Sequence, residues 1–221
     1  SNYVDNLGFA STVPRTAGAA VRFDKISQGG FSRGYTVGQF RGIEITGTSA
    51  IITVADSRFV QPGAASGSAI YIDGVIEAQL HNITIAGERT AQPYAGVHVV
   101  KASGMQLENV GAVYCGIGLA LVPSPGSTIE HIFASRNAWD SNARQGLLIQ
   151  AVPGTTVRRA VFTGDWTATN TRDGILTTGA GAIQDISFIG HRSLNNGGHG
   201  ALFASGTDIG IVGGTFSGNS T

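Results

Sequence analysis

Short apolar strands recur along the chain, and each of them begins just after a glycine. Within each strand apolar and polar residues alternate over four or five positions, which is typical of a β-strand with one buried face. The glycines that open these strands are Gly67, Gly96, Gly118, Gly146, Gly174 and Gly200. Their successive separations of 29, 22, 28, 28 and 26 residues indicate a structural repeat.

A second apolar signature follows each strand, with apolar residues at the first, fourth and sixth positions. We align its copies on Leu80, Leu107, Ile129, Val157, Ile183 and Ile211. In three consecutive repeats an asparagine then stands four residues before the next glycine, at Asn142, Asn170 and Asn196. Because a side-chain amide can donate to one neighbour and accept from the next, these three predict an asparagine ladder.

The repeat length decides among the repeat folds. Helical repeats would show apolar residues every three to four positions, and propeller blades of about 40 residues are too long. We therefore predict an all-β fold, a right-handed parallel β-helix built from three-strand coils of about 22–29 residues. Residues 1–35 are expected to form an N-terminal segment or a first irregular coil, and residues 36–221 the β-helix, continuing or capped beyond the given chain.

Charge and composition narrow the possible partners. The 14 basic residues balance the 14 acidic ones, so no net charge favours nucleic acid. Cys115 is the single cysteine and cannot form an internal disulfide. The sequence contains no apolar segment of 18 residues, so we expect no membrane insertion. No cofactor and no metal ion are implied.

The glycine-opened strands, the I-x-x-I-x-F signature and the asparagine before the next turn together resemble the pectate-lyase-like superfamily of right-handed β-helices. The resemblance covers roughly residues 40–221 and extends to the tailspikes of short-tailed phages. It implies carbohydrate binding or processing, often by a homotrimer. Gly198-His199-Gly200 looks like the polygalacturonase histidine motif, but the other motifs of that branch and the Arg-x-x-Pro-x-x-Arg motif of pectate lyases are missing.

Aligned coils place Asn137, Asp165 and His191 in one column, with the tryptophans and Asp140 close by. Aromatic faces pack against sugar rings, and paired carboxylates perform glycoside hydrolysis. We predict Asp140, Asp165 and His191 as catalytic and Trp139 and Trp166 as substrate-binding residues of one groove. The alternative is that Asp140 and Asp165 are turn residues that bond to nearby backbone.

A second column contains Gln145, Asp173 and His199, again with an acid next to a histidine in the following coil. Asp173 and His199 are therefore the alternate catalytic candidates. Arg144 and Arg172 precede this column and are candidate substrate-binding residues, since an arginine can pair with the carboxylate of an acidic sugar.

Strand alternation also predicts an apolar stripe on the outside of the coils. If Leu147 and Ile175 point inward, the residues after them point outward. The outward residues in the aligned strands are His98, Ala120, Leu148, Leu176 and Leu202. Because an exposed leucine column is unfavourable in a monomer, we expect a homotrimer through Leu148, Leu176 and Leu202. In the alternative, residues 1 to about 35 fold back over the stripe.

These observations favour a tailspike-like β-helix that binds, and in a catalytic form hydrolyses, a bacterial surface polysaccharide during receptor recognition. Such a protein would act in a virion tail, or otherwise outside the cell. Two alternatives remain open. One is a non-catalytic structural spike or adhesin, and the other is a secreted polysaccharide lyase that uses Arg144 and Arg172.

Overall fold

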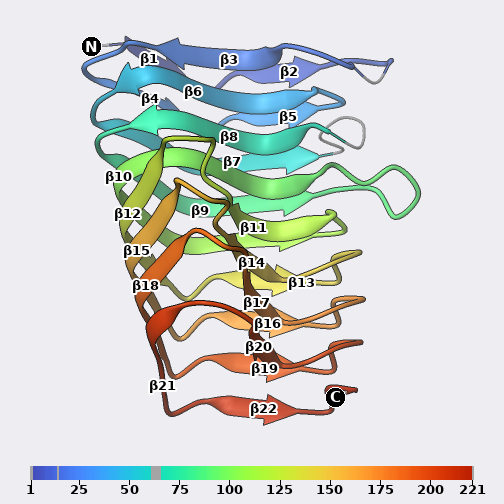
Figure 1. Ribbon diagram of the computed structural model, residues 1–221. Helices are drawn as coiled ribbons and strands as arrows, with labels where there is room; N and C mark the ends of the chain where they lie inside the picture. The colour runs from blue at the N-terminus through green and yellow to red at the C-terminus, as the bar shows by residue number, and fades with distance from the viewer. Residues whose placement is uncertain (1, 14, 61–65, 221) are drawn as a thin grey trace.

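The computed structural model describes residues 2–13, 15–60 and 66–220. These residues form a stack of parallel coils of about eight turns, and no helix occurs among them. Figure 1 shows the coils following one another from the N-terminus at one end to the C-terminus at the other. The parallel β-helix predicted from the glycine spacing is confirmed.

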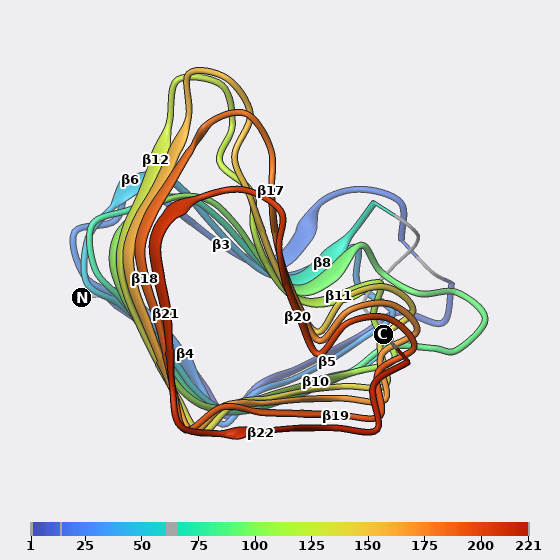
Figure 2. The ribbon, with the colours of Figure 1, turned by 60° about the horizontal axis from the view of Figure 1, so that its bottom comes forward.

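The strands stack into three faces, which surround a common interior (Figure 2). Face 1 comprises β1 (Asn2–Asp5), β4 (Gly29–Ser32), the first parts of β7 (Ile52–Val60) and β9 (Ala78–Ala86), the middle part of β10 (Ala95–Val113), β12 (Thr128–Ser135), β15 (Thr156–Thr163), β18 (Ala182–Ile189) and β21 (Thr207–Val212). Face 1 runs into face 2 within β7, β9 and β10.

Face 2 comprises β2 (Gly8–Ala10), β5 (Tyr35–Val37), the ends of β7, β9 and β10, β13 (Ala138–Asp140), β16 (Trp166–Ala168), β19 (Arg192–Leu194) and β22 (Thr215–Ser217). Face 3 comprises β3 (Ala19–Asp24), β6 (Arg41–Ser49), β8 (Ser68–Val75), the start of β10, β11 (Ile117–Leu121), β14 (Leu147–Gln150), β17 (Ile175–Thr178) and β20 (Ala201–Phe203). Every pairing is parallel, as stacked coils require.

Single residues in the left-handed conformation bend the chain and explain the spacing of three in the apolar signature. Asn109 and Arg136 (φ 54° and 56°) form the corner between faces 1 and 2, and His131 (φ 56°) forms a second bend five residues earlier within β12. Such a residue breaks the in–out alternation, so that apolar residues three positions apart both point inward. The later coils contain both bends and hence the signature at two places.

Because of this duplication, the sequence alignment has the wrong register at two of the five steps between its six copies. Leu107 pairs with Ala134 and not with Ile129, and Ile211 pairs with Phe188 and not with Ile183. Each error is a shift of five residues, the separation of the two bends. The alignment of the glycines is correct from Gly96 onward. It is wrong at Gly67, because the residue opposite Gly96 is Ala69, two residues later.

The glycines that open the face 3 strands are required because the coil is narrow there. A Cβ atom at Gly146 would lie 2.7 Å from Asn170 Nδ2 and 2.9 Å from the backbone oxygen of Gly174, and one at Gly174 would overlap Ser193 Oγ. These distances are shorter than van der Waals contact, so any side chain would push the neighbouring coil away.

The asparagine ladder is confirmed, and it extends to a fourth member. Asn142 Nδ2 donates to Asn170 Oδ1 at 3.0 Å, Asn170 Nδ2 to Asn196 Oδ1 at 2.9 Å, and Asn196 Nδ2 to Asn219 Oδ1 at 2.9 Å. The ladder residues also bond to backbone of adjacent coils, as when Asn170 Nδ2 donates to the Trp139 oxygen at 3.0 Å. The ladder thus satisfies buried polar groups where face 2 turns toward face 3.

The N-terminal residues are part of the stack. β1 pairs with β4 and β2 with β5, so the described residues before position 36 form the first coils. They lie at the end of the stack opposite to β17 and β20, as Figure 1 shows. The alternative in which this segment covers the outward leucines is therefore wrong.

Candidate functional site

The column of Asn137, Asp165 and His191 exists, but its side chains point into the interior of the coil. Asp165 is fully buried and accepts hydrogen bonds from the Asn137 backbone N–H at 3.0 Å, from Asn137 Nδ2 at 3.1 Å and from Trp139 Nε1 at 3.4 Å. Burial raises the pKa of Asp165 to about 6, although these hydrogen bonds act in the opposite direction. Asp165 is thus a corner residue of the interior.

His191 is equally enclosed, one coil further along. Its Nε2 lies 3.0 Å from Thr167 Oγ1, and its ring meets the Phe188 ring edge-on with centroids 5.8 Å apart. Nδ1 has no hydrogen-bond partner among the described residues. Burial lowers the pKa of His191 to about 4, so the imidazole is neutral near neutral pH.

The two tryptophans point to opposite sides of face 2. Trp139 is fully buried, whereas Trp166 is 43% exposed and pairs in register with Ala138. Asp140 lies two residues after Ala138 and shares the outward side with Trp166. The single groove predicted across Trp139, Asp140, Asp165, Trp166 and His191 is therefore wrong. Asp140 and Asp165 lie on opposite sides of the coil wall and cannot flank one glycosidic bond.

The second column brings its members together as the sequence alignment predicts. Asp173 Oδ1 accepts the backbone N–H of His199 at 2.9 Å and lies 3.1 Å from His199 Nδ1. The side chain of Asp173 is 13% exposed and that of His199 is 44% exposed. Arg144 and Arg172 are also neighbours, because the Arg172 N–H donates to the Arg144 backbone oxygen at 3.0 Å. These loops connect face 2 to face 3.

The outward leucine column is in register, from Ala120 through Leu148 and Leu176 to Leu202. Leu148, however, is only 2% exposed, because it packs in a small apolar cluster with Ile117, Ala120 and others of its own chain. Leu176 and Leu202 are half-buried. The surface left for a partner is therefore smaller than the sequence predicted, and the trimer stays a prediction.

Substitution of Leu176 tests this association. If the remaining leucine surface drives it, the wild-type protein should sediment as an oligomer and Leu176→Asp as a monomer, since each buried leucine stabilises by about 1.5–3 kcal/mol. Leu194→Asp, at a half-buried position in β19 on face 2, is the matched control and should leave the oligomer intact. A wild-type monomer at high micromolar concentration would contradict the trimer.

A polar groove that the sequence analysis missed follows the corner between faces 1 and 2. Two hollows of about 290 and 190 Å³ share Gln106 and Glu108, and a third of about 220 Å³ adjoins the first at Asn82. Together they give a depression lined by β9, β10, β12, β13 and β15. We call it the corner groove. Its main side chains are Gln79, His81, Gln106, Glu108, Phe133 and Arg136.

The floor and rim of the corner groove differ in chemistry. Phe133 is 54% exposed and pairs in register with Gln106. The side-chain amides of Gln79 and Gln106 have no partner among the described residues, so they remain available to a ligand. Glu108 and Arg136 form an ion pair at the rim. The groove therefore offers an aromatic ring, free amides and a balanced pair of charges.

The corner groove is assembled from residues far apart in the sequence. Gln79 and Gln106 are 27 residues apart, as are Gln106 and Phe133, and they meet because the coils stack in register. No single segment contains a motif, and glutamine on the outward side of a strand is common. The sequence contains one signal for this groove: in the correct register, the aromatic Phe133 lies beside Gln106.

A cluster of aromatic and charged side chains covers the outer side of face 3 in the earlier coils. The Arg41 guanidinium lies 3.7 Å from the centroid of Tyr71 and forms an ion pair with Glu44. The ring of His98 packs against Tyr71 and Tyr94, with centroids 5.3 and 4.7 Å apart. Burial, with a smaller contribution from the charge of Arg41, lowers the pKa of His98 to about 4. The outward orientation predicted for His98 agrees with this packing.

Comparisons with protein-family models, with curated proteins and with solved structures found no match to this chain. The strand pairing shows a parallel β-solenoid, and no family within this fold class is assigned. Within the described residues, no three histidine, cysteine or acidic side chains gather in a way that could hold a metal ion. The same residues include no helix of the length and apolarity needed to cross a membrane.

Proposed function

We propose that this chain binds a polysaccharide along the corner groove. The observation that carries the proposal is Phe133, a large exposed aromatic ring beside the free amides of Gln79 and Gln106 in a continuous depression. Sugar rings present C–H surfaces that pack on aromatic faces and hydroxyls that pair with amides. The groove crosses four coils, a length of roughly 14 Å from the strand spacing, which suits a short stretch of an extended glycan.

The proposal concerns binding without hydrolysis. Glycoside hydrolysis requires two carboxyl groups about 5 Å or roughly 6.5–9.5 Å apart across the scissile bond. Among the residues that line the corner groove, Glu108 supplies the single carboxylate, and it is paired with Arg136. This arrangement favours a receptor-binding or adhesin role. The resemblance to tailspikes makes bacterial capsules and O-antigens the first ligands to test, for a protein that acts in a virion tail or outside the cell.

The experiment compares two exposed aromatic residues. Wild type, Phe133→Ala and Trp166→Ala are titrated against a panel of bacterial capsular and O-antigen polysaccharides, first on an array and then by calorimetry. Because a buried phenylalanine contributes about 1.5–3 kcal/mol, Phe133→Ala should weaken binding roughly 10- to 100-fold. Trp166→Ala removes a ring of similar exposure on face 2 and should bind like the wild type.

Two results would overturn the proposal. Loss of binding in Trp166→Ala but not in Phe133→Ala would move the site to the outward side of face 2, where Trp166 and Asp140 lie. If the wild type binds no polysaccharide of the panel, the alternative of a non-catalytic structural spike is favoured. Reducing-sugar release by the wild type would show hydrolysis, which this groove does not explain.

A further inference from the structure

Arg144 and Arg172 occupy the same position in two consecutive coils. Backbone hydrogen bonds fix this register, since the Arg172 N–H donates to the Arg144 oxygen at 3.0 Å and the Gly198 N–H to the Arg172 oxygen at 3.0 Å. Both arginines lie in the loops between faces 2 and 3, where Arg172 is exposed and Arg144 half-buried. Their Cα atoms are thus separated by about one coil spacing, roughly 4.8 Å.

Elsewhere in the solenoid, charges that meet in register are often opposite. Arg22 pairs with Glu44, Asp73 with Lys101, and Glu130 with Arg158. Arg144 and Arg172 depart from that pattern, because two cations meet. Neither guanidinium has an ion pair or side-chain hydrogen bond with any described residue. Like charges directly opposite each other destabilise a sheet, so a bound anion would relieve the repulsion.

The acid that adjoins the pair in the sequence forms no ion pair with either guanidinium. Asp173 follows Arg172 directly, but its Oδ1 accepts the backbone N–H of His199 and contacts His199 Nδ1 at 3.1 Å. In the neutral imidazole this contact places the proton on Nδ1 and leaves Nε2 without a protein partner. His199 has a side chain 44% exposed and extends the polar surface by one coil.

We propose that Arg144 and Arg172 form a binding site for an oxyanion, a carboxylate, sulfate or phosphate group borne by a ligand. A guanidinium fork matches the geometry of such groups, and two forks one coil apart can hold one anion between them or successive anions along the axis. The site lies in the loops between faces 2 and 3, away from the corner between faces 1 and 2 (Figure 2). It is therefore independent of the corner groove and of the function proposed there.

The test uses the intact chain and three simple probes: sodium sulfate, sodium phosphate and sodium glucuronate. Wild type, the double variant Arg144→Gln/Arg172→Gln and the control Arg192→Gln are compared by calorimetry and by thermal melting. Sodium chloride at equal ionic strength serves as the reference. Arg192 is exposed on β19 and also has no partner among the described residues, so its replacement removes the same kind of charge elsewhere.

At least one probe should bind the wild type and raise its melting temperature above the chloride reference. The double variant should bind that probe at least roughly tenfold more weakly, since hydrogen bonds between charged groups are the strong ones. Arg192→Gln should match the wild type. The effective probe identifies the ligand group, with glucuronate indicating an acidic sugar and sulfate or phosphate an ester. Equal responses of all three proteins, or no response beyond chloride, would overturn the proposal.

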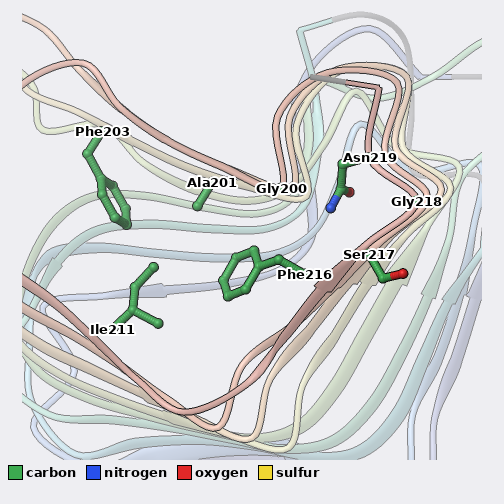
Figure 3. A pocket seen from close by; sticks show the side chains of 8 residues that line it. All are labelled: Gly200, Ala201, Phe203, Ile211, Phe216, Ser217, Gly218 and Asn219. Atoms are coloured by element: carbon green, nitrogen blue, oxygen red, sulfur yellow. The ribbon is translucent and has the colours of Figure 1, made fainter.

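The C-terminal end of the stack supports no second proposal. A hollow of about 420 Å³ lies at this end. Phe203, Ile211 and Phe216 are among the side chains that line it (Figure 3). Its lining is the cross-section of the interior, and nothing in the structure shows what covers it.

Discussion

Replacement of Asn170 with alanine should lower the free energy of unfolding by roughly 2–5 kcal/mol. Asn170 is 1% exposed, and its side chain makes four hydrogen bonds. It accepts from the Asn142 backbone N–H and Nδ2, and it donates to the Trp139 oxygen and to Asn196 Oδ1. Alanine leaves these buried groups without partners, and each unpaired group costs about 1–3 kcal/mol before relaxation or water entry.

Asn219 provides the matched control for this ladder. It is the last member, is half-buried, and accepts from Asn196 while donating to the Ser193 oxygen. Because water can reach the groups that Asn219→Ala releases, the loss should be about 1 kcal/mol or less. Chemical denaturation of the three proteins measures both effects. Equal losses for Asn170→Ala and Asn219→Ala would show that the ladder does not act as a buried network.

Replacement of Asp165 with asparagine should raise the free energy of unfolding at pH 7, by about 1–3 kcal/mol. The folded-state pKa of Asp165 is about 6, above its ordinary value of 3.8, because burial disfavours the charged carboxylate. A raised pKa means that this group stabilises the fold below about pH 4 and that the contribution is lost as pH rises through about 6. Asparagine is neutral at every pH and avoids that loss.

His191 gives the opposite pH dependence and makes the experiment specific. Its pKa is lowered to about 4, so its contribution is present above its ordinary value of 6.5 and is lost as pH falls through 4. In the wild type the two slopes oppose each other between about pH 4 and 6. In Asp165→Asn the opposing Asp165 slope is gone while those of His191 and His98 remain, so stability should fall on acidification more steeply than in the wild type.

Denaturant titrations between pH 4 and 7 measure this difference. Asp140→Asn removes a neighbouring acid on the outward side of face 2 and is the control for the loss of one carboxylate. A destabilised Asp165→Asn protein at pH 7 would contradict the expectation. It would mean that the bonds from Asn137 and Trp139 outweigh the burial of the charge.

Several features of the fold follow from local patterns and could be read without coordinates. The alternation around Leu147 and Leu148 separates an interior from an outward residue, because consecutive side chains of a strand point to opposite sides. Asn142, Asn170 and Asn196 were recognised as a ladder because their spacing equals the coil length. The pairing of Asp173 with His199 followed from the same register.

The sequence alignment is wrong where a single residue changes the direction of the chain. His131 and Arg136 adopt left-handed conformations that a sequence does not announce for these residue types, and each reverses the alternation. The alignment therefore slipped by the five residues between the two bends, and Phe133 was never placed beside Gln106. The sequence places polar residues next to such a bend, above all Asp165, on the outside, whereas Asp165 points inward and accepts the backbone N–H of Asn137 in the preceding coil.

The sequence by itself determined the repeat, the strand that follows each glycine, the ladder and the outward leucine column. These depend on spacing and on the period of two, which are properties of short segments. The tertiary structure alone decided that Trp139, Asp165 and His191 are interior, that Leu148 is covered by its own chain, and that the corner groove exists. Each of these depends on how the coil closes and which coil stacks on which. Closure and stacking set the distance between residues a full turn apart, and no local pattern contains that distance.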